Sequence, residues 1–264
     1  MDGLRSEYVP GRPHPALARH VLRYVGYREH SVAPVRRRQA PTGACTLILG
    51  LGPRLRLFGP AGPSVPVSFL AGMHDAPVVT EFTGAQYGVQ VDLSPLGVFT
   101  LLGRSMRELT NHTPALDELE MPELARLPDH LTDDPGWPQR FARVDALLLR
   151  RLDASRVRPD PEVAHAWDRL RRTSGAVPVQ RLADETGWSR RHLLTRFREQ
   201  VGLAPKQAAR VLRFERAARL VLSPPGGPIT DVAAACGYAD HAHLVREFRT
   251  LAGCTPSQYR AGWS

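Results

Sequence analysis

The sequence predicts an α+β protein of two domains, a β-rich barrel or sandwich with flanking helices followed by an all-α domain. Two observations lead to this prediction. Short apolar runs separated by Gly and Pro fill the first 155 residues, a pattern typical of all-β folds. The last third of the chain instead contains two similar copies of a helical segment. Because 264 residues suffice for two domains of ordinary size, we expect domains at residues 1–155 and 156–264.

The N-terminal part is expected to contain strands bracketed by helices. The strand candidates are short apolar or alternating runs at residues 45–52, 54–59, 68–73, 77–82 and 86–93. The helix candidates lie at residues 15–24, 95–103 and 137–152. The last of these helices carries one apolar stripe, formed by Phe141, Val144, Leu148 and Leu152. This stripe suits two partners, a second copy of the chain in a homodimer or the β-rich part of the same chain.

One pattern occurs twice in the last third of the chain. The first copy begins at Leu182 (LADETGWSRRHLLTRFREQVGLAP) and the second at Val232 (VAAACGYADHAHLVREFRTLAGCTP). Matching apolar, Gly and Pro positions are 50 or 51 residues apart. Each copy predicts a helix, a turn with Gly and a second helix, with Ser189 and Asp240 as N-caps. The repeat therefore predicts two helix-turn-helix units.

The second helix of each copy is expected to bury one stripe and to expose the opposite face. The buried stripes are Leu193, Phe197 and Val201 in the first copy, and Leu244, Phe248 and Ala252 in the second. The opposite faces carry Arg191, Thr195 and Arg198, and Ala242, Arg246 and Arg249. In the DNA major groove, Arg can bind guanine, and Thr or a small apolar side chain can contact the thymine methyl group.

Two histidines, His241 and His243, lie one residue apart at the start of the last of these helices. Side chains with this spacing point about 160° apart on a helix, so they cannot together hold one metal ion. We therefore expect no metal site here. His241 falls in the first turn, where such a helix reaches bases, and His243 falls at the flank, toward a phosphate strand.

A long helix is expected between the two units, at residues 206–222, ended by SPPGGP at 223–228. Such a helix would hold the units a fixed distance apart, and two units about 34–36 Å apart meet successive turns of the major groove. The charge agrees with a nucleic-acid partner. Residues 159–264 hold 16 basic and 10 acidic side chains, and the whole chain has a net charge of +9. A GC-rich genome would also favour arginine over lysine.

These residues resemble the AraC/XylS family of bacterial transcription regulators. The resemblance covers roughly residues 160–262 and is most specific in GYADHAHLVREFRTLAGCTPSQYR, at 237–260. It implies two helix-turn-helix units, joined by a linker helix, that bind double-stranded DNA at promoters and commonly contact RNA polymerase. With the exposed faces above, it assigns DNA binding to Ser189, Arg190, Arg191, Leu194 and Thr195, and to His241, Ala242, His243 and Arg246.

The N-terminal half shows a looser resemblance to the same regulators. It rests on PHPALARHVLRYVGYRE at residues 13–29 and on LSPLGVFTLLG at 93–103, followed by RELTN. These halves are often cupin-like sensor barrels, which implies a small-molecule effector. The alternative is a β-rich domain that only dimerises or binds a partner protein.

No motif of a hydrolase elbow, a phosphate-binding loop or a zinc protease occurs, so we expect neither an enzyme nor a cofactor. The alternative is a DNA-docked enzyme or repair-type protein that uses Cys45. The cysteines, widely separated, are expected to be buried and reduced. His74 and Asp75 are expected to be structural. The run Arg36–Arg38 is expected in a solvated loop, with contact to an acidic ligand or the DNA backbone as the alternative.

No apolar run approaches the ~20 residues that span a bilayer. The N-terminus also lacks the apolar stretch of a signal peptide. We therefore expect a cytoplasmic protein without membrane contact.

Overall fold

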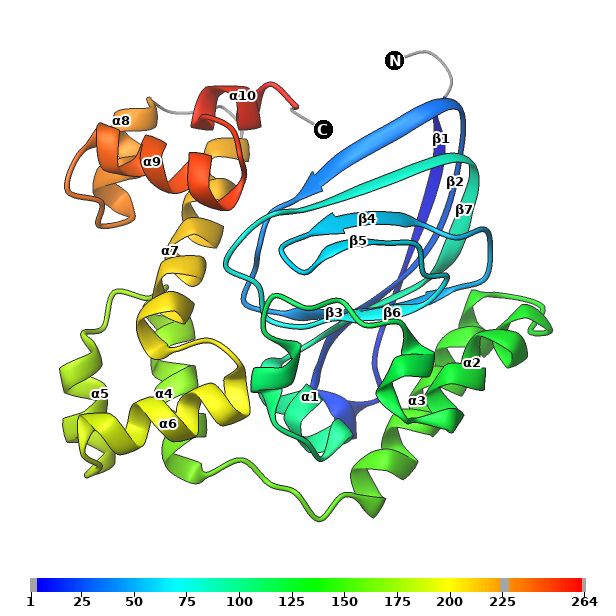
Figure 1. Ribbon diagram of the computed structural model, residues 1–264, viewed down its shortest axis with the longest axis horizontal. Coiled ribbons are helices and arrows are strands. Elements are labelled where there is room, and N and C mark those ends of the chain that lie inside the picture. Colours follow the sequence, from blue (N-terminus) through cyan, green and yellow to red (C-terminus); the bar gives the residue numbers. More distant parts are fainter. Residues whose placement is uncertain (1–3, 224–227, 263–264) are drawn as a thin grey trace.

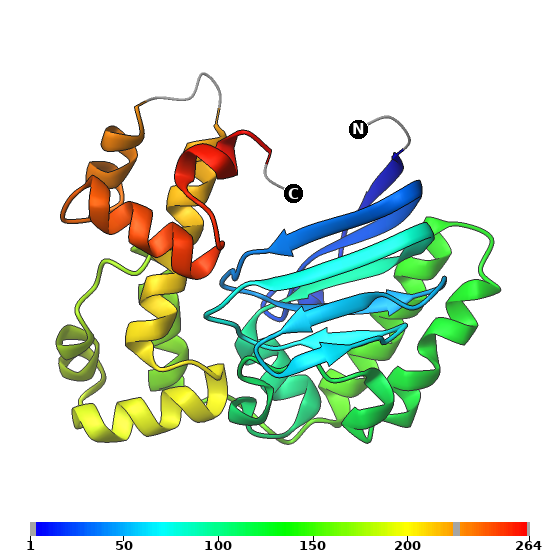
Figure 2. The ribbon, with the colours of Figure 1, turned by 45° about the horizontal axis from the view of Figure 1, so that its top comes forward.

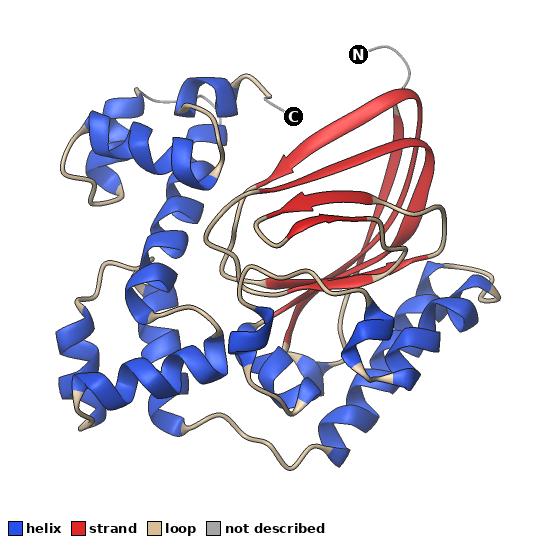
Figure 3. Ribbon diagram, in the orientation of Figure 1, coloured by secondary structure: helices blue, strands red, loops and turns tan. Residues whose placement is uncertain are grey.

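The computed structural model describes residues 4–223 and 228–262 and divides into a β-rich N-terminal part and a helical C-terminal part (Figure 1). Figure 3 shows the strands gathered in the N-terminal part, with helices below them and throughout the C-terminal part. The predicted α+β fold of two parts is confirmed. The expected boundary after residue 155 falls between α3 (Trp137–Ala154) and α4 (Pro161–Arg172), and it stays a prediction.

The described residues of the N-terminal part form one antiparallel sheet of seven strands. These are β1 (Arg5–Gly11), β2 (Val21–Gln39), β3 (Cys45–Gly50), β4 (Arg56–Gly59), β5 (Gly62–Ser64), β6 (Phe69–Ala71) and β7 (Val78–Leu93). The long strand β7 pairs on one side with β2 and on the other side with both β4 and β3. The sheet curls at this point, so that the β4–β5 hairpin lies across its concave side (Figure 1).

The two faces of the sheet differ because neighbouring side chains of a strand point to opposite faces. On one face, Leu47 and Leu93 lie against Val98 of α1 (Pro95–Leu102) and Leu148 of α3. Figure 2 shows these helices, with α2 (Pro122–Thr132), below the sheet. The other face is more polar, and it lines a cavity that is described below.

The apolar stripe of α3 packs inside its own chain. Phe141, Val144 and Leu148 are buried, and the Phe141 ring stacks on that of Tyr24 at 5.8 Å between centroids. Gly11, the last residue of β1, lies against the same ring. A Cβ atom added there would come within 2.7 Å of the Phe141 ring, so this position of β1 needs glycine. Of the two partners that suit the stripe, the chain's own sheet is the one observed. A homodimer through residues 137–152 would have to use the exposed face of α3.

Three predictions in the N-terminal part are wrong. Residues 15–24 are not one helix, because only Pro15–Leu17 form a short 3-10 helix and β2 begins at Val21. The run Arg36–Arg38 lies on β2 and not in a loop, because β2 continues past a bulge and pairs with β7 as far as Gln39. The strands expected at 77–82 and 86–93 are one strand. Gly84, with φ +77°, lies at the same bulge and allows the chain to continue through it.

The C-terminal part contains two groups of helices that share one long helix. Its helices after α4 are α5 (Val179–Thr186), α6 (Arg190–Val201), α7 (Pro205–Leu222), α8 (Ile229–Ala235), α9 (His241–Leu251) and α10 (Pro256–Arg260). As far as Leu212, α7 belongs to a core shared with α4–α6 and the N-terminal part; from Phe214 on it belongs to a separate core with α8–α10. The helix expected at 206–222 is confirmed. Its proposed terminator includes residues 224–227, which lie outside the described residues.

Candidate nucleic-acid interface and ligand cavity

Each helix-turn-helix unit has the turn that the repeat predicts. Helix α5 ends at Gly187 and the turn after α8 contains Gly237, with φ of +69° and +71°. This left-handed backbone favours glycine. The second helices begin with side-chain caps. The backbone N–H of His192 donates to Ser189 Oγ at 3.2 Å, and that of His243 donates to Asp240 Oδ1 at 2.6 Å.

The buried stripes of α6 and α9 are confirmed. Leu193, Phe197 and Val201 are fully buried, and Leu244 and Phe248 occupy the same places in the second unit. Their rings and side chains pack on the first helix of each unit and on α7. The opposite faces of α6 and α9 therefore remain at the surface.

The residues predicted to bind DNA gather on these outward faces. The exposed ones are Ser189, Arg190, Arg191 and Thr195 in the first unit, and His241, Ala242 and Arg246 in the second. Leu194 and His243 are half-buried. Arg198 and Arg249, one turn further along, are exposed as well. Each unit thus presents basic side chains beside small ones, the combination that a base-contacting helix needs.

The two histidines of α9 have different environments. The His243 ring meets the Tyr238 ring edge to face at 5.2 Å, and its Nδ1 accepts a hydrogen bond from the N–H of Ala239 at 3.4 Å. The first unit repeats this arrangement, with His192 against Trp188 at 4.4 Å. His243 therefore holds the turn against the helix, whereas His241 projects from the first turn. The repeat in the sequence already matches Trp188 with Tyr238 and His192 with His243, which is the sequence signal for these two ring contacts.

Not every arginine of α6 faces outward. The Arg196 guanidinium binds both carboxylate oxygens of Asp160, at 2.7 and 3.0 Å, and also Glu199. These hydrogen bonds and the guanidinium charge lower the pKa of Asp160. Arg196 thus joins α6 to the start of α4, and its role is structural.

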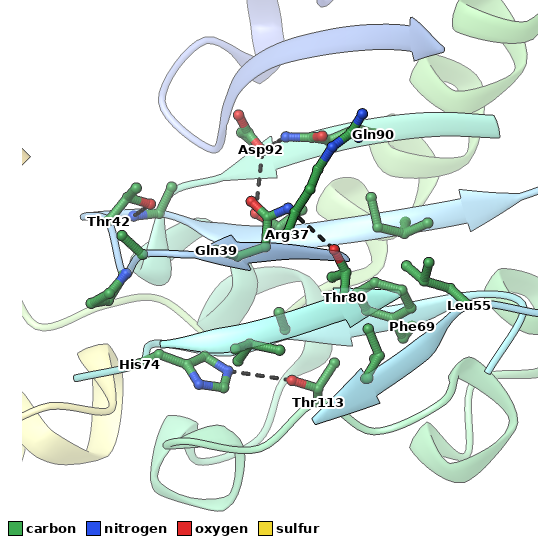
Figure 4. A pocket seen from close by; sticks show the side chains of 18 of the residues that line it. Arg37, Gln39, Thr42, Leu55, Phe69, His74, Thr80, Gln90, Asp92 and Thr113 are labelled. Carbon is green, nitrogen blue, oxygen red and sulfur yellow. Dashed lines mark hydrogen bonds between the residues drawn. The ribbon is translucent and has the colours of Figure 1, made fainter. Parts of the chain in front are cut away.

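A cavity of about 630 Å³ lies on the concave side of the sheet (Figure 4). Its polar wall comes from alternate positions of β2, β3 and β7, and its apolar wall from Ile48, Leu57 and Phe69. The polar side chains include Tyr8, Arg23, Glu29, Arg37, Gln39, Thr46, His74, Thr80, Gln86, Gln90, Asp92 and Thr113. The alternation of Gln86, Gln90 and Asp92 with apolar residues was a sequence signal for this wall.

The charges of the cavity are paired. Arg37 donates to both oxygens of Glu29, at 2.9 and 2.7 Å, and Tyr8 donates to the same carboxylate. Arg23 pairs with Asp92. Burial lowers the pKa of His74 in this wall, which favours its neutral ring, and burial raises the pKa of the Tyr27 hydroxyl. His74 interacts with the Thr113 hydroxyl at 3.4 Å, in line with its predicted structural role.

The described residues contain no cluster suited to catalysis by Cys45 or to metal binding. Cys45 is fully buried on β3, and burial raises the pKa of its thiol, which removes the thiolate that such chemistry needs. No group of three or more His, Cys, Asp or Glu in that part of the chain could hold a metal ion. Among the same residues, no helix is both long and apolar enough to cross a membrane.

Comparison with known proteins identifies the C-terminal part. A family described as a helix-turn-helix domain matches residues 182–262, which run from α5 to α10. Residues 182–262 form an AraC-type helix-turn-helix domain. A second family, a domain of unknown function (DUF6597), matches residues 11–115, most of the curled sheet. The cupin-like character of that sheet stays a prediction.

Curated relatives named as transcription regulators match about half of the chain. The HTH-type transcriptional regulator Rv1931c of Mycobacterium tuberculosis is 31% identical over 127 residues, 48% of each chain. The HTH-type transcriptional activator RhaR of Klebsiella pneumoniae is 32% identical over 131 residues, 50% of this chain and 40% of the relative. The chain thus spans about half the length of these relatives or less.

Crystal structures of ToxT from Vibrio cholerae align with nearly the whole chain. One of them covers 99% of this chain and 98% of its own, with a TM-score of 0.50 and 8% identity. This likeness concerns the two-part fold alone.

Proposed function

We propose that the protein is a sequence-specific transcription regulator that binds two successive segments of the DNA major groove. One observation carries this proposal: two helix-turn-helix units of the same construction each expose a basic face, and one continuous helix joins them. We assign base contacts to Arg191, Leu194 and Thr195 in α6, and to His241, Ala242 and Arg246 in α9. Ser189, Arg190 and His243 are assigned to the flanks, toward phosphate. A transcription regulator of this bacterial type acts on DNA in the cytoplasm, and we propose that location for this protein.

The linker helix fits this spacing. Helix α7 has 18 residues, about 27 Å at 1.5 Å per residue. Successive major-groove faces lie about 34–36 Å apart, a distance of the same order as the length of this helix. A single chain would therefore occupy both segments.

We propose the cavity of the curled sheet as the site of a small-molecule effector. Its volume is in the range of about 300–1,000 Å³ that is usual for ligand sites. Because Arg37 pairs with Glu29 and Arg23 with Asp92, the wall offers no unbalanced charge. The expected effector is uncharged, with an apolar body for the Phe69 side and hydroxyl or amide groups for the polar wall. The cavity favours this function over a domain that only dimerises.

A thermal-shift screen tests the effector site. Neutral alcohols and amides should raise the unfolding temperature, and carboxylates of equal size should not, since a ligand of the native state stabilises it by mass action. Thr80 lines the cavity, and the exposed Thr83 on the same strand does not. Thr80→Tyr should abolish the shift, while Thr83→Tyr should keep it. A larger shift with the carboxylates would contradict an uncharged effector.

We propose activation as the outcome, because RhaR relatives are named transcriptional activators. Activation requires contact with RNA polymerase, which transcription in vitro with purified polymerase would reveal. A homodimer through α3 would use its exposed face, which carries Gln139, Arg143 and Arg150. Sedimentation at several protein concentrations tests for it.

Selection from a random DNA library tests the DNA-binding proposal. The purified protein should enrich one sequence with two conserved blocks, and its affinity should fall with salt while preference for that sequence remains. Equal binding to all sequences, lost with salt, would show that the basic faces hold phosphates only.

A further inference from the structure

The two helix-turn-helix units are attached to the N-terminal part in different ways. The first unit shares a continuous core with it, since Val201 and Leu203 belong to the same buried cluster as Met106 and Leu109. The second unit has its own core. Among the described residues, the side chain of the N-terminal part that packs on this core is Ala40. The position of the second unit therefore depends on α7 and on few other contacts.

Between the residues that the structure describes, two polar contacts hold the second unit and its end of α7 to residues 38–44, which we call the β2 end segment. Arg38 Nη1 donates to the carbonyl of Gly253, at the end of α9, at 2.6 Å. The N–H of Gly43 donates to Glu215 Oε2 on α7 at 3.0 Å. The guanidinium lies directly over Gly253, because a Cβ atom there would come within 2.1 Å of Nη1. The φ of +69° at Gly253 also favours glycine.

The first unit has a matching contact. The Thr110 hydroxyl donates to the carbonyl of Gly202, at the end of α6, at 2.9 Å. Gly202 and Gly253 are equivalent positions of the repeat. The N-terminal part thus holds each recognition helix at the equivalent carbonyl, that of Gly202 or Gly253, through two different elements.

The β2 end segment also borders the cavity. Ala40, Pro41, Thr42 and Ala44 line it. Arg37 and Gln39, on either side of Arg38 along β2, line it as well, and the Arg38 side chain points to the other face of the strand, toward α9. One short segment therefore lies between the cavity and the second unit.

We propose that the β2 end segment determines the separation of the two DNA segments that the protein accepts, by fixing the second helix-turn-helix unit relative to the first. Arg38 and Glu215 are then specificity-determining residues, although neither lies on a recognition helix. A ligand in the cavity that moves this segment would change the accepted separation, because it would favour one arrangement of the units. This inference rests on the proposed function.

The test uses the DNA sequence selected by the wild-type protein, with one or two base pairs added or removed between its two blocks. The wild-type protein should lose affinity at each altered separation. Arg38→Ala should reduce this loss about threefold to tenfold, as expected for the net contribution of one exposed hydrogen bond, and should bind the original separation nearly as well. Glu215→Ala, which removes the acceptor of the Gly43 N–H, should act in the same direction.

Arg36→Ala is the matched control. Arg36 lies on the same strand, two residues earlier, and its guanidinium lies over the Phe58 ring of the sheet, 5.6 Å from the centroid. The Arg36→Ala substitution removes the same charge as Arg38→Ala and should leave the preference for the original separation unchanged. An unchanged preference in Arg38→Ala, or equal relaxation in Arg36→Ala, overturns the proposal. If the wild-type protein selects no sequence, the proposed function itself fails and this inference falls with it.

Discussion

The two histidines of α9 differ at the scale of single residues. His241 is exposed in the first turn, whereas His243 packs on Tyr238 and accepts from Ala239. His241→Ala should weaken DNA binding and leave the unfolding temperature unchanged. His243→Ala should lower the free energy of unfolding by about 1 kcal/mol, through the lost ring contact and hydrogen bond. Anisotropy titrations and thermal unfolding of both variants decide, and the reverse result would contradict the assignment.

The outward arginines carry the base contacts in the proposed function. Arg191→Ala or Arg246→Ala should cost about 1–3 kcal/mol of binding to the selected sequence and relax the preference at one base step. Competition titrations against single-base variants measure both effects. Arg28→Ala, an exposed site on β2, is the control and should change neither. Equal weakening on every sequence would instead make these arginines phosphate contacts.

Single residues of the repeat were predictable because their roles are local. A capping Ser or Asp, a glycine at positive φ and an i, i+4 stripe act within one turn of helix. The role of Arg196 was not predictable, because its partner Asp160 is 36 residues away. The partner of Arg38 is 215 residues away, at Gly253.

At the scale of elements, helices were predicted better than long strands. The segment 15–24 places Leu17, Val21 and Tyr24 at helical spacing, and all three are buried. The chain nevertheless extends from Val21, because β2 pairs with both β1 and β7. Such pairing is non-local and overrides the local pattern. The helix at 137–152 was predictable, but its partner was not, since the same stripe suits a sheet or a second copy.

The contact between α4 and α5 gives a dependence on pH. Glu185 of α5 accepts hydrogen bonds from Arg169 and His165 of α4, which lower its pKa to about 2. A folded-state pKa below the unfolded value of ~4.3 means that the stabilisation is complete above that value and is lost as pH falls toward 2. Glu185→Gln should therefore lower the unfolding temperature at pH 6, and the difference from wild type should shrink between pH 4.5 and about 2.

Unfolding temperatures measured across this pH range, for both proteins, check that expectation. Glu123→Gln, at an exposed position of α2, is the control and should follow the wild type throughout. A difference in unfolding temperature between Glu185→Gln and wild type that stays constant over the whole pH range would show that the charge of Glu185 does not contribute to stability.

At the scale of the whole molecule, the arrangement of the two parts was not predictable from the sequence. The repeat and the basic C-terminal segment predict the DNA-binding half, yet nothing local indicates that its first unit shares a core with the N-terminal part. Interdomain hydrogen bonds such as that from Gln207 to Asp75, at 2.8 Å, join residues 132 positions apart. These contacts join the N-terminal part to the helix-turn-helix units, which the sequence presents as separate halves.

The central claim is that one chain places two recognition helices in successive turns of the major groove. Hydroxyl-radical footprinting of the wild-type protein on its selected sequence tests this most directly. We predict two protected segments on one face of the duplex, about 10 base pairs apart, with Arg246→Ala weakening only one of them. A single protected segment, or diffuse protection that vanishes with salt, would contradict the account.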